Sequence, residues 1–216
     1  LRRQRQMCIR DRCIYLVGAS GSGKSFWISE YSKQFKKLYP KSPVYFISAK
    51  NINDEKDIKT IKGIKQINTT DEEYLQELCE NNNPSELFSY KNGLEPSLVI
   101  FDDSINGISI KKSKYISQIM TSILEVGRSK KIYCLIAVHS ANKGKESKIM
   151  LQEMNGCVIF NNGVTKHSKN YLLEKYLGFD SRLINKIINT RSRWTFINKI
   201  VPMYIVNDNS LYFINN

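Results

Sequence analysis

The sequence lacks any hydrophobic run long enough to cross a membrane as a helix. Such a helix needs about 20 mostly apolar residues, and no stretch of the 216 residues approaches that length. The start of the chain is charged but has no apolar segment of the kind that forms the core of a secretory signal. A membrane-spanning protein is therefore not expected, and nothing in the sequence supports secretion.

Paired cysteines are also missing. The five cysteines are an odd number, and none of them forms a C-x-x-C pair, so neither a disulfide framework nor a zinc ribbon is expected. Cys134 and Cys157 lie inside apolar runs, where a free cysteine behaves as a small buried hydrophobic residue. This use of cysteine is typical of a reducing, intracellular compartment.

Acidic residues are scarce relative to basic ones. The chain has 33 Lys and Arg against 20 Asp and Glu, which gives a formal net charge of +13. The hydrophobic fraction of 41% and the charged fraction of 25% are close to those of globular proteins, so wholesale disorder is not expected. The basic excess favours an anionic partner: nucleic acid, nucleotide or an acidic membrane face.

Residues 1–12, LRRQRQMCIRDR, show neither a helical nor a strand period. This segment resembles a translated sequencing-adaptor read-through at the edge of a gene, and the alternative is a basic arm that touches nucleic acid. We predict a non-native or disordered basic extension over 1–12, followed by a single domain over 13–216. The segment supplies five arginines and one aspartate, so the rest of the chain remains strongly basic without it.

The remaining sequence alternates between short apolar runs and amphipathic stretches. Apolar runs that indicate buried strands cover 13–17, 44–48, 98–101, 132–138 and 157–160. Helices are predicted over 26–38, 71–80 (with Thr70 as the cap and Glu73 in a capping box), 85–90, 113–127, 169–177 and 181–189. Residues 50–70 predict a loop with a marginal strand at its end, and 143–148 a basic loop. The last strands are predicted over 194–198, 203–206 and 211–214, with a hairpin turn at 207–210.

This order predicts an α/β fold of three layers, in which helices cover both faces of a mostly parallel central sheet and a β-hairpin closes the C-terminus. The sequence shows neither an internal repeat nor a linker between domains. In sheets of this kind, ligands bind at the carboxyl ends of the strands.

A phosphate-binding loop follows the first strand. Residues Gly18–Ser25 match G-x-x-x-x-G-K-S without departure. The glycines allow the backbone N–H groups to point inward as an anion nest, and the start of the next helix presents its positive dipole end. Lys24 can reach the β- and γ-phosphates, and the Ser25 hydroxyl can ligate Mg²⁺. The predicted ATP-binding residues are Gly18, Ala19, Ser20, Gly21, Ser22, Gly23, Lys24, Ser25 and Phe26.

Two carboxylates come directly after the third apolar run, in the segment LVIFDD at 98–103. A strand that ends in Asp102 can deliver this carboxylate to the Mg²⁺ ion, and Asp103 can act as the general base that polarises the attacking water. A solvated turn, or a cap for the following segment, is the alternative. Because the strand 44–48 lies between the two motifs in sequence, the chain fits the additional-strand class of P-loop enzymes.

The fourth strand is flanked by polar residues that suit a hydrolytic site. His139 follows the strand and is a candidate sensor of the γ-phosphate, although a surface histidine fits as well. Arg128 precedes the strand and is a candidate arginine finger directed into a neighbouring subunit. Alternatively, Arg128 compensates the dipole at a helix end, and Arg191 and Arg193 compete for the finger role.

Taken together, these motifs resemble the FtsK–HerA superfamily of P-loop ATPases, which belong to the additional-strand, RecA-like class. The nearest resemblance is to the poxvirus-type genome-packaging ATPases of large DNA viruses and virophages. It rests on GASGSGKS at 18–25, LVIFDD at 98–103, G-R-x-K-K-I at 127–132 and the compact tail. Two departures affect the sensor assignment: His139 and Ser140 stand where the family often has glutamine, and Ser129 where histidine often follows the arginine.

The resemblance implies an ATP- and Mg²⁺-dependent motor that pumps double-stranded DNA into a capsid. It further implies a homo-oligomeric ring, DNA contact without sequence preference, a capsid protein as a possible partner, and a location in the host cytoplasm at the site of virion assembly or in the virion. Basic clusters at Lys111, Lys112 and Lys114, and at Lys143, Lys145 and Lys148, could line the channel. Solvated lysine from an AT-rich genome is the alternative.

Two other functions stay open. A small-molecule or nucleoside kinase would need a lid such as Arg182, Arg191 and Arg193 could form, although the paired aspartates and the extra strand argue against it. A nucleotide-dependent virion assembly factor would use the same motifs to switch shape. A RecA-type recombinase shares the motifs, whereas an ABC-type cassette is disfavoured because no LSGGQ-like signature is present.

Overall fold

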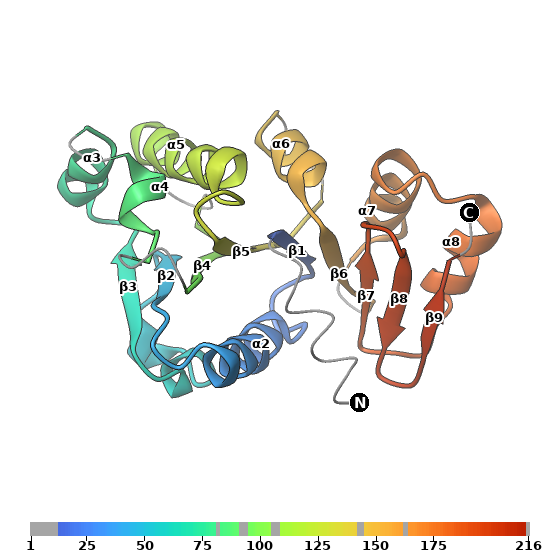
Figure 1. Ribbon diagram of the computed structural model, residues 1–216. Coiled ribbons are helices and arrows are strands. Elements are labelled where there is room, and N and C mark those ends of the chain that lie inside the picture. The colour runs from blue at the N-terminus through green and yellow to red at the C-terminus, as the bar shows by residue number, and fades with distance from the viewer. Residues whose placement is uncertain are drawn as a thin grey trace. The chain divides into compact units, whose positions relative to one another are not determined.

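The computed structural model describes residues 13–80, 83–90, 95–104, 109–141, 145–161 and 164–214 (Figure 1). The chain forms two compact units. The first unit contains Ser25–Ile136, and the second contains Cys13–Lys24 together with Ala137–Asn216. The predicted extension 1–12 lies outside the described residues, and the single domain over 13–216 stays a prediction.

The strands of the first unit are ordered β3-β2-β4-β5. Strand β2 (Val44–Ser48) pairs in parallel with β3 (Ile64–Asn68) on one side and with β4 (Ser97–Asp102) on the other. All six residues of β4 are buried, as expected for a strand that is covered on both faces. Strand β5 (Ile132–Val138) completes the order, and its last residues, Ala137 and Val138, belong to the second unit.

Helices cover both faces of these strands (Figure 1). Helix α2 (Lys24–Leu38) lies on one face and buries Ile28, Tyr31 and Phe35, which recur at the predicted helical spacing. The other face carries α3 (Glu72–Glu80), α4 (Pro84–Leu87) and α5 (Ile110–Val126). The link between β2 and β3 contains two short 3₁₀ turns, η1 (Ile52–Asp54) and η2 (Ile58–Thr60).

The second unit combines a parallel pair with an antiparallel extension, in the order β1-β6-β7-β8-β9. Strand β1 (Cys13–Val17) is parallel to β6 (Gly156–Phe160). Strands β7 (Trp194–Asn198), β8 (Tyr204–Asn207) and β9 (Leu211–Phe213) continue antiparallel from β6. The helices are α6 (Lys145–Glu153), α7 (Lys166–Asn170), the π-helical turn η3 (Tyr171–Tyr176) and α8 (Ser181–Ile188).

The predicted fold class is confirmed: the sheet is mostly parallel, helices lie on both faces of the first unit, and antiparallel hairpins end the chain. The prediction is refined in one respect, because β2 lies on the side of β4 away from β5. In the first unit, β5 lies beside β4. The last residue of β5, Val138, belongs to the second unit, where its carbonyl accepts a hydrogen bond from Gly18 N.

Several predicted helix boundaries were wrong, and capping explains two of them. Asp71, rather than Thr70, caps α3, because its carboxylate accepts from Tyr74 N at 3.1 Å. Helix α5 begins at Ile110 instead of Ser113, since Ser109 accepts from Lys112 N. The predicted basic loop 143–148 contains the start of α6 at Lys145, and its residues 143–144 lie outside the described residues.

Two expected absences can be examined in the described part of the chain. Cys13, Cys79, Cys134 and Cys157 are free thiols there, and Cys134 and Cys157 are buried as predicted. Burial raises the pKa of the Cys157 thiol to about 12. Within the same residues, no helix has the length and the apolar character that crossing a bilayer requires.

Candidate functional site

The phosphate loop leaves β1 in a tight turn that the backbone itself stabilises. Gly18 N donates to Val138 O at 3.1 Å, and Ser22 N donates to Ala19 O at 3.2 Å. Gly21 and Gly23 have φ angles of +72° and +104°, in the region that side chains with a β-carbon disfavour. The glycines of the motif therefore meet a conformational need that the sequence pattern predicts.

Gly18 has a different role, which is close packing. A β-carbon at this position would lie 2.5 Å from Ser22 Oγ and 2.8 Å from Phe160 Cβ. The loop therefore rests against the carboxyl end of β6, with no space for a side chain. Ser22 Oγ is itself buried and makes no hydrogen bond within the described residues, so this hydroxyl is available to a phosphate oxygen.

Lys24 is folded back into the loop. Its side chain is buried, and Nζ donates to Gly18 O at 2.7 Å and to Ala19 O at 3.1 Å. An ammonium group that lies among backbone carbonyls is positioned to meet phosphate anions brought into the loop. The Ser22 hydroxyl, which makes no hydrogen bond within the described residues, and the Lys24 ammonium are together suited to bind the phosphates of a nucleoside triphosphate.

Ser25 and Phe26 belong to the first unit, in the first turn of α2. The helix begins at Lys24, as the motif predicts, so its positive dipole end adjoins the loop. Phe26 is 60% exposed, and an exposed ring here could stack on the flat face of a base.

The acidic pair lies at the carboxyl end of β4. Asp102 is the last residue of the strand and is only 1% exposed, whereas Asp103 has a φ angle of +46° and is half-buried. A positive φ is unusual for aspartate and turns the chain sharply at this point. The two carboxylates therefore differ in burial, with Asp102 enclosed and Asp103 partly open to solvent.

Lys50 contacts this pair, and the sequence analysis missed it. Its Nζ lies 3.6 Å from Asp102 Oδ2 and 3.5 Å from Glu55 Oε1. Burial lowers the pKa of Lys50, but the nearby charges of Asp102, Glu55 and Asp103 outweigh this effect and raise it. Lys50 follows β2, which pairs with β4 in parallel, so both strand ends meet at one edge. The position after a buried strand was the only available signal.

The donors of the first unit fit a magnesium ion. Mg²⁺ prefers oxygen ligands, keeps several waters, and takes one or two carboxylates together with substrate phosphates. Asp102 supplies a buried carboxylate, and Ser25 supplies a hydroxyl in the first turn of α2. No cluster of three or more His, Cys, Asp or Glu able to hold a metal occurs among the described residues.

His139 follows directly after the strand residue that is bonded to the phosphate loop. Its neighbours are fixed in place, since Tyr15 Oη donates to Ser140 O at 3.4 Å and Ala141 N donates to Ser168 Oγ at 3.3 Å. The end of β5, the loop and α7 therefore form one connected set in the second unit. This placement suits a group that senses the nucleotide.

In the first unit, Arg128 lies at the edge where β4 begins, which is opposite the edge that carries Asp102. It is exposed in the turn before β5, and Lys131 O of the same turn accepts from Ser97 N at the start of β4. With six residues in β4 and a rise of about 3.3 Å per residue, this turn is roughly 16 Å from Asp102. Arg128 therefore cannot reach the acidic pair of its own chain.

The rival arginines occupy the other edge. Asn161 N donates to Arg193 O at 3.1 Å, and Asn161 follows β6, which is parallel to β1. Arg193 thus shares an edge with the phosphate loop of its own chain, and its side chain is exposed, as is that of Arg191. Arg128 is thus remote from the acidic pair of the first unit, whereas Arg193 lies at the phosphate-loop edge of the second unit.

The sequence did not predict a buried lysine at the end of β6, the edge of the second unit that also carries Arg193. Lys169 is 7% exposed, and its Nζ donates to Asn161 O at 2.6 Å. Burial lowers its pKa. It comes from α7, where the helical pattern in the sequence gave no indication of a cation pointing toward the end of β6.

No protein-family model matches the sequence, but one curated protein and several solved structures are similar to it. Protein V3 of the Sputnik virophage is 29% identical over 204 residues, covering 91% of this chain and 74% of that protein. Among solved structures, B204, the DNA-packaging ATPase of Sulfolobus turreted icosahedral virus, superimposes with a TM-score of 0.57. It is 13% identical, with 95% of this chain and 97% of B204 covered.

The chain has the fold of a genome-packaging ATPase. The resemblance to packaging ATPases that the motifs indicated is confirmed at this level. The packaging-ATPase fold is shared with TcpA, the conjugation coupling protein of plasmid pCW3, at a TM-score of 0.53, 13% identity and coverage of 95% of this chain and 60% of TcpA. Identities this low establish a common architecture, and the chemistry must be argued from the site itself.

Proposed function

We propose that the chain is a Mg²⁺-dependent ATPase that translocates double-stranded DNA and packages a viral genome into a capsid. The observation that carries the proposal is the buried Lys24 ammonium, which donates to Gly18 O and Ala19 O. The loop around it has glycines at positive φ, and it lies in a packaging-ATPase fold. The solved B204 structures support it, because one holds ATP-gammaS and is described as a genome-packaging NTPase.

Each residue of the site has a role in this proposal. The N–H groups of Gly18–Ser25 and the Lys24 ammonium bind the phosphates, and Ser25 and Asp102 hold the magnesium ion. That ion, when bound, neutralises charge on the β- and γ-phosphates. Asp103 takes the proton of the attacking water, while His139 contacts the γ-phosphate from the end of β5.

The position of Arg128 supports an oligomer. Because this arginine lies at the edge away from Asp102 of its own chain, it can act on hydrolysis only from a neighbouring subunit. A head-to-tail contact that closes into a ring supplies such a neighbour at every site. A ring also surrounds double-stranded DNA, contacts its backbone without reading sequence, and presents one face to a capsid protein in the host cytoplasm.

The proposal is tested by measuring phosphate release from ATP with and without double-stranded DNA, in magnesium and in EDTA. We expect hydrolysis only with magnesium, and several-fold stimulation by DNA of any sequence. Transfer of the phosphoryl group to a nucleoside instead of water would replace the motor by a kinase. ATP binding without hydrolysis would replace it by an assembly factor.

Subunit mixing tests the role of Arg128. Arg128→Ala and Asp103→Ala variants should each be inactive alone, because every interface lacks one partner. In a randomly mixed ring, roughly a quarter of the interfaces pair an intact Asp103 with an intact Arg128 from the next subunit. We therefore expect part of the wild-type phosphate release to return on mixing.

Arg193→Ala mixed with Asp103→Ala is the matched control. Arg193 has no role in the proposed mechanism, so Arg193→Ala should hydrolyse ATP near the wild-type rate by itself, and mixing it with Asp103→Ala should add nothing to the activity of its own subunits. If the Arg128 mixture stays inactive, Arg128 does not act in trans. If Arg193→Ala is inactive alone and the mixture regains activity, Arg193 is the finger instead.

A further inference from the structure

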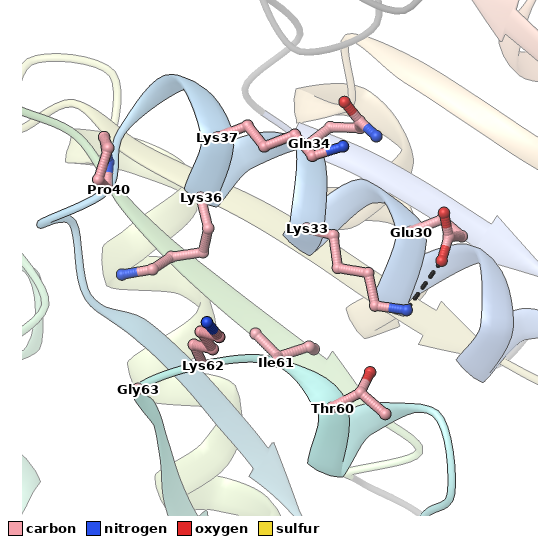
Figure 2. Close-up of a pocket in the computed structure, with 10 residues that line it drawn as sticks. All are labelled: Glu30, Lys33, Gln34, Lys36, Lys37, Pro40, Thr60, Ile61, Lys62 and Gly63. Atoms are coloured by element: carbon pink, nitrogen blue, oxygen red, sulfur yellow. Dashed lines mark hydrogen bonds and ion pairs between the residues drawn. The ribbon is translucent and has the colours of Figure 1, made fainter.

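A groove rich in lysine lies between α2 and the segment that leads into β3. Its volume is about 610 Å³, within the range of ligand-binding pockets. Figure 2 shows α2 on one side, and η2 with the following turn on the other. The residues that line this lysine groove are Glu30, Lys33, Gln34, Lys36, Lys37, Pro40, Thr60, Ile61, Lys62 and Gly63.

The lysine groove is remote from the acidic pair. It is bordered by Pro40, shortly before β2 begins at Val44, and by Gly63, directly before β3 begins at Ile64. Val44 and Ile64 are partners in the register, so both strands start at the same edge. Lys50 and Asp102 lie at the carboxyl ends, and the four steps from Val44 to Ser48, at about 3.3 Å each, place these ends roughly 13 Å away. The groove is therefore a second site.

Charge dominates this groove. Four lysines and one acidic residue, Glu30, line the groove. Glu30 forms an ion pair with Lys33 at 2.9 Å. Lys36 donates to Ser42 O at 2.8 Å, which fixes its ammonium inside the groove. Burial lowers the pKa of Lys36, although Glu95 opposes this effect. Lys37 and Lys62 are exposed, and neither forms an ion pair within the described residues.

Compensation of the helix dipole accounts for only part of this arrangement. Lys36 and Lys37 lie in the last turn of α2, where cations are favourable. Lys62 comes from a different segment, and Figure 2 shows it opposite Lys36 across the groove. Lysines from two segments thus line one hollow, which concentrates positive potential and attracts an anion with several charges.

We propose that the lysine groove binds the phosphodiester backbone of DNA, at the strand edge opposite the acidic pair. This proposal rests on the proposed function, in which DNA is the substrate of the motor. Lysine ammonium groups are point charges that contact phosphate oxygens without reading bases. The lining includes no aromatic residue, so bases have no stacking platform, and sequence-independent contact with the backbone follows.

The groove also has a direct connection to the nucleotide. Ser25 is in the first turn of α2, and Lys36 and Lys37 are in its last turn. At about 1.5 Å per residue, one rigid helix of roughly 18 Å joins the two places. A shift of α2 on nucleotide binding would therefore move the backbone contacts with it.

The test is the charge reversal Lys37→Glu with Lys62→Glu, in exposed side chains that leave the buried core intact. Affinity for a double-stranded DNA of random sequence is measured without nucleotide over a range of salt concentrations. We expect binding to weaken at least tenfold, and the slope of log K against log[salt] to become shallower by about 2, since each phosphate contact contributes about 0.9.

The matched control is Lys166→Glu with Lys175→Glu, which changes net charge equally on exposed residues of the second unit. If the control weakens binding as much, or the groove variant binds like wild type, the proposal is wrong. It is also wrong if tripolyphosphate binding is lost while DNA affinity is kept, which would assign the groove to a free polyphosphate. Failure of the proposed motor function is detected by a different experiment, the ATPase assay, in which the wild-type protein would not hydrolyse ATP.

Discussion

Replacing Lys24 by alanine is expected to lower ATP hydrolysis by at least roughly 100-fold, the scale seen when a charge-stabilising donor is removed from an active site. The wild-type ammonium is buried and already held at the loop by Gly18 O and Ala19 O, so it reaches the phosphates without a large rearrangement. Steady-state phosphate release measures the loss. Lys166→Ala removes one exposed positive charge from the same chain and should leave the rate near wild type.

ATP binding provides a second readout for the same variant. A ligand that binds only the folded state raises the thermal midpoint, and we expect ATP to raise it for wild type far more than for Lys24→Ala. Lys24→Arg keeps the charge but replaces a compact ammonium by a planar fork, which the two carbonyls of the loop do not accommodate, so it should also be inactive. Near-normal hydrolysis by Lys24→Ala would remove the phosphate loop from the mechanism.

Asp103→Asn is expected to lower hydrolysis by roughly 100-fold or more while ATP binding is kept, because a general base contributes to the reaction and little to ground-state affinity. Asp102→Asn should instead weaken the part of ATP binding that depends on magnesium. Asp102 is buried beside Lys50 at the end of β4, whereas Asp103 is half-buried, with a φ of +46°. Thermal midpoints with ATP, in magnesium and in EDTA, separate the two effects.

Asp54→Asn is the control for both carboxylates, since it removes an exposed negative charge in η1 of the same unit. Its rate and its ATP-dependent midpoint should match wild type. If Asp103→Asn hydrolyses ATP normally, another group activates the water. If Asp102→Asn keeps the full effect of magnesium, the ion is held without β4.

Local sequence patterns predicted most of the secondary structure because the signals are local. Apolar runs such as 13–17 and 132–138 became buried strands with the predicted bounds, since an all-apolar segment must be covered on both faces. Helix ends were less accurate. The start of α3 depends on whether Thr70 or Asp71 reaches the free N–H groups, a choice between neighbours that spacing alone does not make.

The candidate site divides in the same way. The motif at 18–25 specified its own turn, because the positive φ angles at Gly21 and Gly23 are a property of the residues themselves. Lys50 and Lys169 gave no comparable signal. The role of each lysine depends on a partner outside its own short sequence pattern, Asp102 for Lys50 and Asn161 for Lys169. From the sequence alone, a lysine at either position looks like an ordinary solvated surface residue.

The sequence by itself determined the phosphate loop, the buried strands and the basic character of the protein, because these follow from residue type and spacing over short distances. Only the tertiary structure decided that β5 is the strand beside β4, that Arg128 lies away from the acidic pair of its own chain, and that Lys36 and Lys62 face one groove. Strand order and the approach of distant segments depend on how the whole core packs, and no short window of sequence contains that information.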